Sequence, residues 1–349
     1  MSLKNNAEMN KFSFSLFVLI VIVFFSSCST DVDMYADYKD ITIVYGIADI
    51  ADDTTWIKIT KAFAGPGNAL IIAANPDSSN YPYKLSVQLI GKKAGSDELP
   101  PVVLDTMTIH NKQTTEYIVD DAGDTVVLHP FYGPNQLMYY TAEKLLADYT
   151  YQLKIDNKGK LIQGETPLIS NFSVSYPVNR ISFPTNPALA DPEVKWKSVE
   201  NGKRYEVSLT FNYKELLPGT TDTLLKTVDW FLGTRASNTL AGNEDMVISY
   251  SGLNFFTMLE NQLESIPNVQ RWAGLVDIHV AAGSQVLQTF LDINGSSGSL
   301  LEEVPLYTNM DGAIGIFASR HNSIKSIRLA VLTESDLVNK YDLGFKLPQ

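Results

Sequence analysis

The sequence predicts a mostly β protein made of two antiparallel β domains, the second of which carries one amphipathic helix. From residue 41 onward, short apolar runs alternate with polar residues at a period of two, the pattern of half-buried strands. Turn residues separate these runs, and aromatic side chains make up 11% of the chain, which β structure favours. Residues 251–266 depart from the pattern and repeat apolar side chains at helical spacing.

The chain begins with a segment typical of a lipoprotein export signal, residues 1–27. Two lysines precede an uncharged apolar run over residues 12–25, and two serines lead into Cys28. The run is shorter than the roughly 20 residues of a membrane-spanning helix. We expect cleavage before Cys28 and attachment of acyl chains such as palmitate, so that lipid anchors the mature protein to a membrane. Two alternatives are an uncleaved membrane helix and a secreted protein with a free thiol.

Residues 28–40 form an acidic tether behind this cysteine, with aspartate at four positions. One interpretation is a solvated linker. The other is that the stretch resembles the signal that sends Bacteroidetes lipoproteins to the outer face of the cell, which implies a surface-exposed protein of the outer membrane.

Net charge restricts the partners of the mature chain. The formal charge of the full sequence is −12, from 39 acidic and 27 basic residues, which disfavours nucleic acid and anionic lipid surfaces. With a single cysteine no disulfide forms within the chain, so hydrophobic burial must hold the fold together.

The first domain is expected over residues 41–176, as an immunoglobulin-like or fibronectin-like sandwich. Its seven candidate strands suit that fold and cover residues 41–47, 56–63, 83–90, 102–109, 125–128, 149–155 and 169–176. The 149–155 strand resembles the penultimate strand of fibronectin-type domains.

A proline-rich linker over residues 177–192 is expected to precede the second domain, residues 193–349. Strands are predicted there at 194–199, 205–213, 224–232, 246–250, 275–281, 286–293, 313–317 and 324–332. The amphipathic helix over 251–266 ends before Pro267 and is expected to pack on the second sheet. Residues 309–312 are expected to form a tight turn, after which Gly315 lets a neighbouring backbone approach.

No catalytic or metal-binding motif is present in the sequence. The four histidines are scattered, and neither a nucleophile elbow nor a phosphate-binding loop occurs. The acidic loops at 49–53 and 120–124 are predicted to be turns with solvated charges, and calcium binding is the alternative. We predict no catalytic residue, no metal and no cofactor.

Aromatic side chains offer a candidate binding surface. Tyrosines in loops can stack on sugar rings or on a peptide, or they can close the edge of a sandwich core. The candidates are Tyr81, Tyr83, Tyr132, Tyr139 and Tyr140. Arg320 either pairs with a carboxylate at the end of a strand or faces an acidic ligand.

Four threonines follow an aspartate and precede a small or apolar residue: Thr54, Thr106, Thr125 and Thr223. These positions resemble the O-glycosylation sites that Bacteroidetes use on exported proteins. Chance is the alternative in a chain rich in Asp and Thr.

Two segments at opposite ends of the chain carry a family resemblance. Residues 43–47, 56–63 and 65–69 near the start, and 305–320 near the end, together with Cys28, resemble an uncharacterised family of Bacteroidetes lipoproteins. The resemblance implies an outer-membrane lipoprotein without established catalytic residues, a family sometimes found with TonB-dependent transporters.

These observations favour a non-enzymatic, lipid-anchored protein of the cell surface that binds a glycan or peptide or serves as accessory subunit of a TonB-dependent uptake system. A fimbrillin-like structural or adhesive subunit that assembles by strand addition is one alternative. The other is a glycan hydrolase with carboxylates dispersed along the chain, which requires two acids within reach of one bond.

Overall fold

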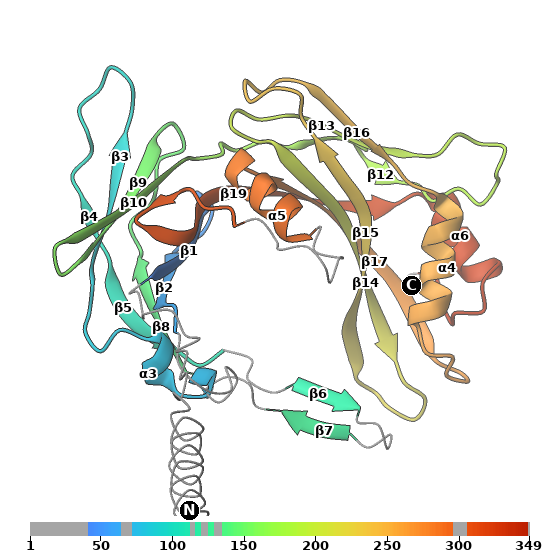
Figure 1. Ribbon diagram of the computed structural model, residues 1–349. Coiled ribbons are helices and arrows are strands. Elements are labelled where there is room, and N and C mark those ends of the chain that lie inside the picture. The colour runs from blue at the N-terminus through green and yellow to red at the C-terminus, as the bar shows by residue number, and fades with distance from the viewer. Residues whose placement is uncertain are drawn as a thin grey trace, which may run out of the picture. The chain divides into compact units, whose positions relative to one another are not determined.

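The computed structural model describes residues 41–63, 72–111, 116–119, 125–128, 135–295 and 306–347, and within 116–119 and 125–128 the backbone only. These residues confirm the prediction of a mostly β protein with largely antiparallel sheets (Figure 1).

The largest sheet has nine strands and contributes to both hydrophobic cores. Its path is β15-β14-β17-β19-β1-β2-β8-β5, with β12 also paired to β19. The strands are β1 Thr42–Ala48, β2 Thr55–Lys61, β5 Asp105–Ile109, β8 Gln136–Thr141, β12 Arg180–Ile181, β14 Arg204–Leu216, β15 Thr223–Ala236, β17 Gln270–Gly283 and β19 Ala313–Leu329. Only β19 makes parallel pairs in this sheet, with β1 and with β12.

Three smaller sheets complete the β structure. One has the order β18-β10-β9-β3-β4, with β18 Met310–Asp311, β10 Lys160–Pro167, β9 Thr150–Asn157, β3 Ser86–Lys92 and β4 Val102–Val103. The next has β11 Val174–Tyr176, β13 Glu193–Lys197 and β16 Asp245–Ser249, and the last pairs β6 Glu116–Val119 with β7 Thr125–Leu128.

The first hydrophobic core lies between the nine-stranded sheet and the five-stranded sheet, which pack together as a β-sandwich. Val44, Ile57 and Tyr139 enter it from one sheet, and Leu89 and Leu153 from the other. The second core lies between β14, β17 and the end of β19 on one side and β13, β16 and two helices on the other. Its members include Val207, Ile278, Leu329, Trp196 and Phe255.

Four helices occur in the described residues, where the sequence predicted one. They are α3 Pro76–Ser79, α4 Gly252–Gln262, α5 Gln285–Gly295 and α6 Val331–Asn339. Helix α4 lies within the predicted segment 251–266, which confirms that prediction, and it packs Phe255, Phe256 and Leu259 into the second core.

The predicted strand over 286–293 is wrong, because this segment is helix α5. A short, dense apolar run is compatible with either a strand or a helix. The apolar residues of this run also have helical spacing, so they lie on one face of a helix: Val286, Leu287, Phe290 and Leu291. β17 ends at Gly283. The backbone carbonyl of Ser284 then accepts a hydrogen bond from the backbone N–H of Gln288, which closes the first turn of the helix.

Two other strand predictions are corrected by the pairing. Residues 174–176 form β11, which pairs with β13 beside the second core instead of completing the first sandwich. The segments 313–317 and 324–332 are one strand, β19, followed by α6. Residues 180–181, in the predicted linker, pair with β19, and Ile181 and Phe183 are buried in the second core.

The closing segment connects the two cores. β18 pairs with β10, and the first half of β19 pairs with β1, so Met310 and Phe317 belong to the first core. Gly315 has φ +110°, and a Cβ atom there would lie 1.9 Å from the Val44 carbonyl oxygen. The predicted close approach at Gly315 is thus confirmed. The domain boundaries at 176 and 193 stay a prediction.

Candidate binding surface

Both cores lie on the same face of β19, and among the described residues the other face of the nine-stranded sheet borders neither core. Ile316 and Ala318 on that other face are nevertheless buried. Phe317 and Ile327 point into the first and second core respectively. Residues of the opposite parity, such as Arg320 and Ile324, point the other way, because side chains alternate along a strand. We call this second surface, from β15 to β5, the open face.

Aromatic side chains from four neighbouring elements lie along one half of the open face. Tyr45 of β1 meets Phe290 of α5 edge to face, with ring centroids 6.1 Å apart. Trp56 of β2 is paired with Tyr140 of β8, with centroids 5.2 Å apart. We call Phe290, Tyr45, Trp56 and Tyr140 the aromatic band.

Polar and apolar side chains border the aromatic band. Lys58 is the cross-strand neighbour of Tyr45, and Asp105 that of Tyr140. Tyr45 is 44% exposed and Met107 on β5 is also 44% exposed, whereas Trp56 and Tyr140 are partly buried. The band thus combines ring surface with a cation and a carboxylate.

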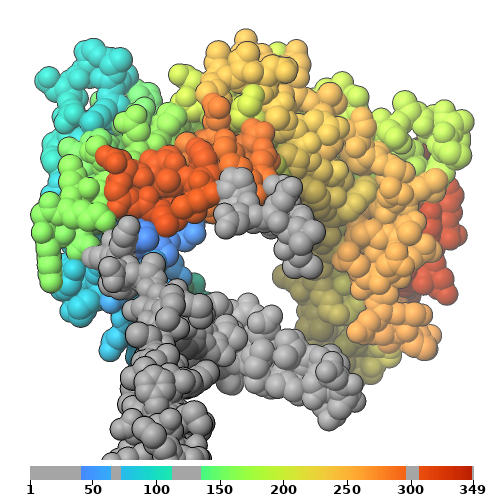
Figure 2. Space-filling view, in the orientation of Figure 1, coloured from blue at the N-terminus to red at the C-terminus, as the bar shows by residue number. Residues whose placement is uncertain are grey.

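Helix α5 lies on the open face next to the band. Leu287 packs over Gly283 of β17, and Phe290 contacts Tyr45 of β1. In the space-filling view, the orange surface at the centre includes α5 (Figure 2).

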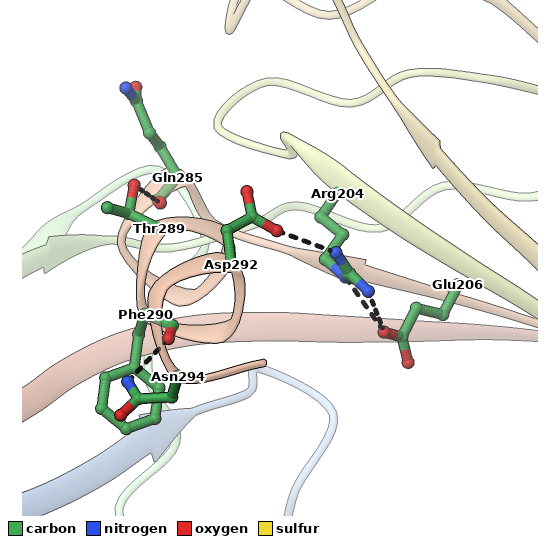
Figure 3. Close-up of polar contacts among 7 residues, drawn as sticks. All are labelled: Arg204, Glu206, Gln285, Thr289, Phe290, Asp292 and Asn294. Carbon is green, nitrogen blue, oxygen red and sulfur yellow. Dashed lines mark hydrogen bonds and ion pairs between the residues drawn. The ribbon is translucent and has the colours of Figure 1, made fainter. Parts of the chain in front are cut away.

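An ion-pair chain connects α5 to β14 (Figure 3). The Arg204 guanidinium lies 3.3 Å from Asp292 of α5 and 3.0 Å from Glu206 of β14. The Arg204 side chain is 24% exposed, so water screens these pairs only in part. They orient the C-terminal half of the helix above the sheet.

A row of oxygen-bearing side chains lies on the other half of the open face. Thr210 donates to Asp229 at 2.6 Å, and Asn212 donates to Asp277 at 2.8 Å. Ser326 also donates to Asp277. These groups satisfy one another across β15, β14, β17 and β19.

Arg320 pairs with carboxylates, which is one of the two alternatives that the sequence allowed for this residue. Its guanidinium lies 3.8 Å from Asp49 and 3.7 Å from Asp52. Asp49 is buried and also contacts His321 Nδ1 at 2.9 Å, so the cluster joins the end of β1 to β19. Asp49 further accepts the backbone N–H of Ala51, which makes the 49–53 loop a turn.

A polar cleft of about 830 Å³ lies at the C-terminal end of α4. Carboxylates of Glu260, Glu264 and Asp342 line it together with Arg271 and Lys346, and its lining includes no aromatic side chain. Arg271 is fully partnered there, because its guanidinium donates to Glu215, to the Leu343 carbonyl and to the Glu264 carbonyl.

The structure separates the tyrosines that the sequence grouped together. Tyr139 is 2% exposed in the first core and accepts the Leu85 backbone N–H, and burial raises its pKa. Tyr81 and Tyr83 pack against the same core, where their hydroxyls meet Thr42 and Asn157. Tyr140 alone of the described candidate tyrosines lies on the open face, and Tyr132 lies outside the described residues.

Three members of the aromatic band were missed by the sequence analysis, namely Tyr45, Trp56 and Phe290. One signal was present. Residues 43, 45 and 47 of β1 are apolar or aromatic although Val44, Gly46 and Ala48 already face the first core. A strand that is apolar on both faces indicates a second contact surface.

Cys28, the tether and the 120–124 loop lie outside the described residues. Of the candidate glycosylation sites, Thr223 is exposed at the start of β15, whereas Thr54 and Thr106 are partly exposed. Thr125 lies in β7, whose side chains are not described. Within the described ranges no group of His, Cys, Asp or Glu is placed to hold a metal ion. None of the helices described is long and apolar enough to cross a membrane.

Comparisons with known proteins identify no family. No protein-family model matches the chain, and no curated protein matches it. Among solved structures, the FN1-FN3 domains of chicken CNTN1 show 11% identity and a TM-score of 0.17 over 82% of this chain and 67% of that one. The BSP domain of a biofilm associated protein shows 9% identity and a TM-score of 0.15 over 82% and 58%. Similarity at these scores supports no conclusion about function.

Proposed function

We propose that this chain is a membrane-anchored, non-enzymatic binding protein that holds a glycan chain against the aromatic band. The observation that carries the proposal is the series Phe290, Tyr45, Trp56 and Tyr140, which crosses four adjacent elements on a sheet face that borders neither core. Aromatic rings present a large apolar surface at low conformational cost, and the sugar ring offers a matching flat face.

The dimensions of the band suit an extended ligand. Neighbouring strands lie about 4.8 Å apart, so β1, β2, β8 and β5 together span roughly 15 Å. Lys58 and Asp105 border the band and place an ammonium and a carboxylate beside the rings, where a sugar offers hydroxyl groups. Asp105 also lies 3.7 Å from the Lys84 ammonium in an exposed ion pair. Three side chains of the band belong to strands of one sheet, which limits the conformational entropy lost on binding.

The export signal supports the anchored part of the proposal. Lipid on Cys28 holds the protein at the outer membrane, and the acidic residues 28–40 give it reach from the surface. We infer that such a protein passes captured glycan to a neighbouring TonB-dependent transporter, because the family that the sequence resembles is sometimes found with such transporters.

The test is binding of the full chain in detergent to a panel of soluble polysaccharides. Replacing one aromatic ring by alanine removes about 1 kcal/mol of binding free energy, which raises the Kd about fivefold. We expect this for Tyr45→Ala and Trp56→Ala. The matched control is Tyr176→Ala, because Tyr176 is 47% exposed, similar to Tyr45 at 44%, but lies on β11 away from the open face.

Two results would contradict the proposal. If Tyr176→Ala weakens binding as much as Tyr45→Ala, the band is not the binding surface. If extended peptides bind and no polysaccharide does, the proposed ligand class is wrong, and the aromatic band is a peptide-binding surface instead.

A further inference from the structure

Strand β15 is the outer strand of the nine-stranded sheet. Among the described strands it pairs with β14 alone (Figure 1). Its C-terminal end approaches β16, where Arg235 Nε donates to the Val247 carbonyl at 3.1 Å. The pairing with β14 shifts register at Leu232, so the regular part of the free edge covers residues 223–231.

This edge carries large apolar side chains that its own fold leaves exposed. Leu225 is 81% exposed and Phe231 is 60% exposed. Edge strands are usually protected by charges, prolines or bulges within the strand. Here the two charged residues of the regular edge, Lys226 and Asp229, are engaged within the chain by Glu215 and Thr210.

The edge sequence is complementary to itself in one antiparallel register. If Val228 faces Val228 of a second copy, Leu225 faces Phe231, and Thr227 faces Asp229. Lys226 then faces Trp230, an arrangement that allows a cation–π contact. Apolar and hydrogen-bonding cross-strand pairs of these kinds are favourable.

Neighbouring registers are less favourable. Centring the pair on Lys226 or on Asp229 places like charges directly opposite each other. Centring it on Thr227 places Asp229 opposite Leu225. A twofold axis between antiparallel strands always brings one residue opposite its own copy, and these are the registers nearest to the centre of the edge.

We propose that β15 is a self-association edge, at which two copies of this chain pair their β15 strands antiparallel about Val228. The two nine-stranded sheets then form one continuous sheet. The partner is a second copy because the edge pairs with its own sequence through apolar and hydrogen-bonding residues and places no like charges opposite each other. The interface goes beyond the proposed function, since it uses β15 and leaves the aromatic band uncovered.

A charge-swap experiment on the full chain in detergent tests this register. The acidic variant carries Leu225→Glu and Phe231→Glu, and the basic variant carries Leu225→Lys and Phe231→Lys. The two positions face each other across the proposed interface, so each variant repels its own copy. We expect dimers of the wild type in sedimentation velocity over a micromolar concentration series, monomers of either variant alone, and recovery of the dimer when both variants are mixed.

Surface controls keep the result interpretable. Leu161→Glu alters a leucine that is 56% exposed on β10 and should leave the dimer unchanged. Circular dichroism confirms that the paired variants are folded. A monomeric wild type at the highest concentration, or variants that remain dimeric alone, would overturn the proposal. Monomeric variants that fail to dimerise on mixing would overturn the register about Val228.

Discussion

Arg271 lies beside the second core although it carries a full positive charge. Its side chain is 2% exposed, and Nε donates to Glu215 Oε2 at 2.8 Å. Lys226 Nζ approaches the other oxygen of Glu215 at 2.6 Å. Burial raises the pKa of Glu215, but the hydrogen bonds and charges of Lys226 and Arg271 outweigh it, so the net pKa of Glu215 lies below its ordinary value.

This pair predicts a stability loss in acid. Unfolded Glu has a pKa of about 4.3, so the ionised Glu215 stabilises the fold above that pH, and the stabilisation is lost as the pH falls through the lower folded-state pKa. We expect Glu215→Gln to lower the free energy of unfolding near neutral pH by about 3–5 kcal/mol, because Arg271 stays buried without its carboxylate. The difference from wild type should shrink in acid. Urea unfolding across the acid range measures it.

Asp53→Asn is the control for this prediction. The Lys144 ammonium beside Asp53 lowers the pKa of that carboxyl, but the pair is solvent-exposed. Exposed pairs contribute little to stability. If Glu215→Gln keeps a constant difference from wild type at every pH, the proposed ionisation of Glu215 is wrong.

Helices α4 and α5 have the same length but are held in place by different contacts. Both span 11 residues, but α4 buries Gly252, Phe255, Phe256 and Leu259, whereas no residue of α5 is fully buried. Helix α5 is held by the Leu287 and Phe290 contacts and by the Arg204–Asp292 pair. A helix held by few buried contacts opens locally more often than one in the core.

Hydrogen exchange should therefore distinguish the two helices. We expect the amides of α5 to exchange faster than those of α4, because less apolar surface must be exposed to open α5. Arg204→Ala should accelerate exchange in α5 further and leave α4 unchanged. Mass spectrometry of peptides from each helix measures both effects. Equal protection of α4 and α5 would show that the contacts of α5 are stronger than their burial indicates.

Strand β19 contributes to both hydrophobic cores of the molecule. Phe317 is 0% exposed in the first core, and Ile327 is 4% exposed in the second. The strand pairs with β1 in its first half and with β17 in its second half. Unfolding of either core therefore removes a strand from the other.

This connection predicts that the two cores unfold together. Phe317→Ala should cost about 3–5 kcal/mol, and Ile327→Ala about 2–5 kcal/mol. We expect both variants to move one common transition, followed by tryptophan fluorescence and by circular dichroism. Two separate transitions, each shifted by only one of the variants, would instead support independent domains over 41–176 and 193–349.

Local sequence patterns were enough for features that depend on nearby residues. The alternation along β14 and the helical spacing of Phe255 and Leu259 predicted a strand and a helix that the structure contains. Gly315 was identified because close backbone approach needs a residue without a side chain. Each of these signals lies within a few positions of the element it describes.

The sequence by itself determined that this protein is mostly β and where most strands and helix α4 lie, whereas the lipoprotein signal over residues 1–27 stays a prediction. Only the tertiary structure decided that 286–293 is a helix, that β19 serves both cores, and that Tyr45 and Trp56 share an open face with Tyr140. The reason is physical. Strand pairing depends on the summed packing of residues far apart in the chain, such as Val44 beside Gly315, and a period of two is compatible with many partners and either face.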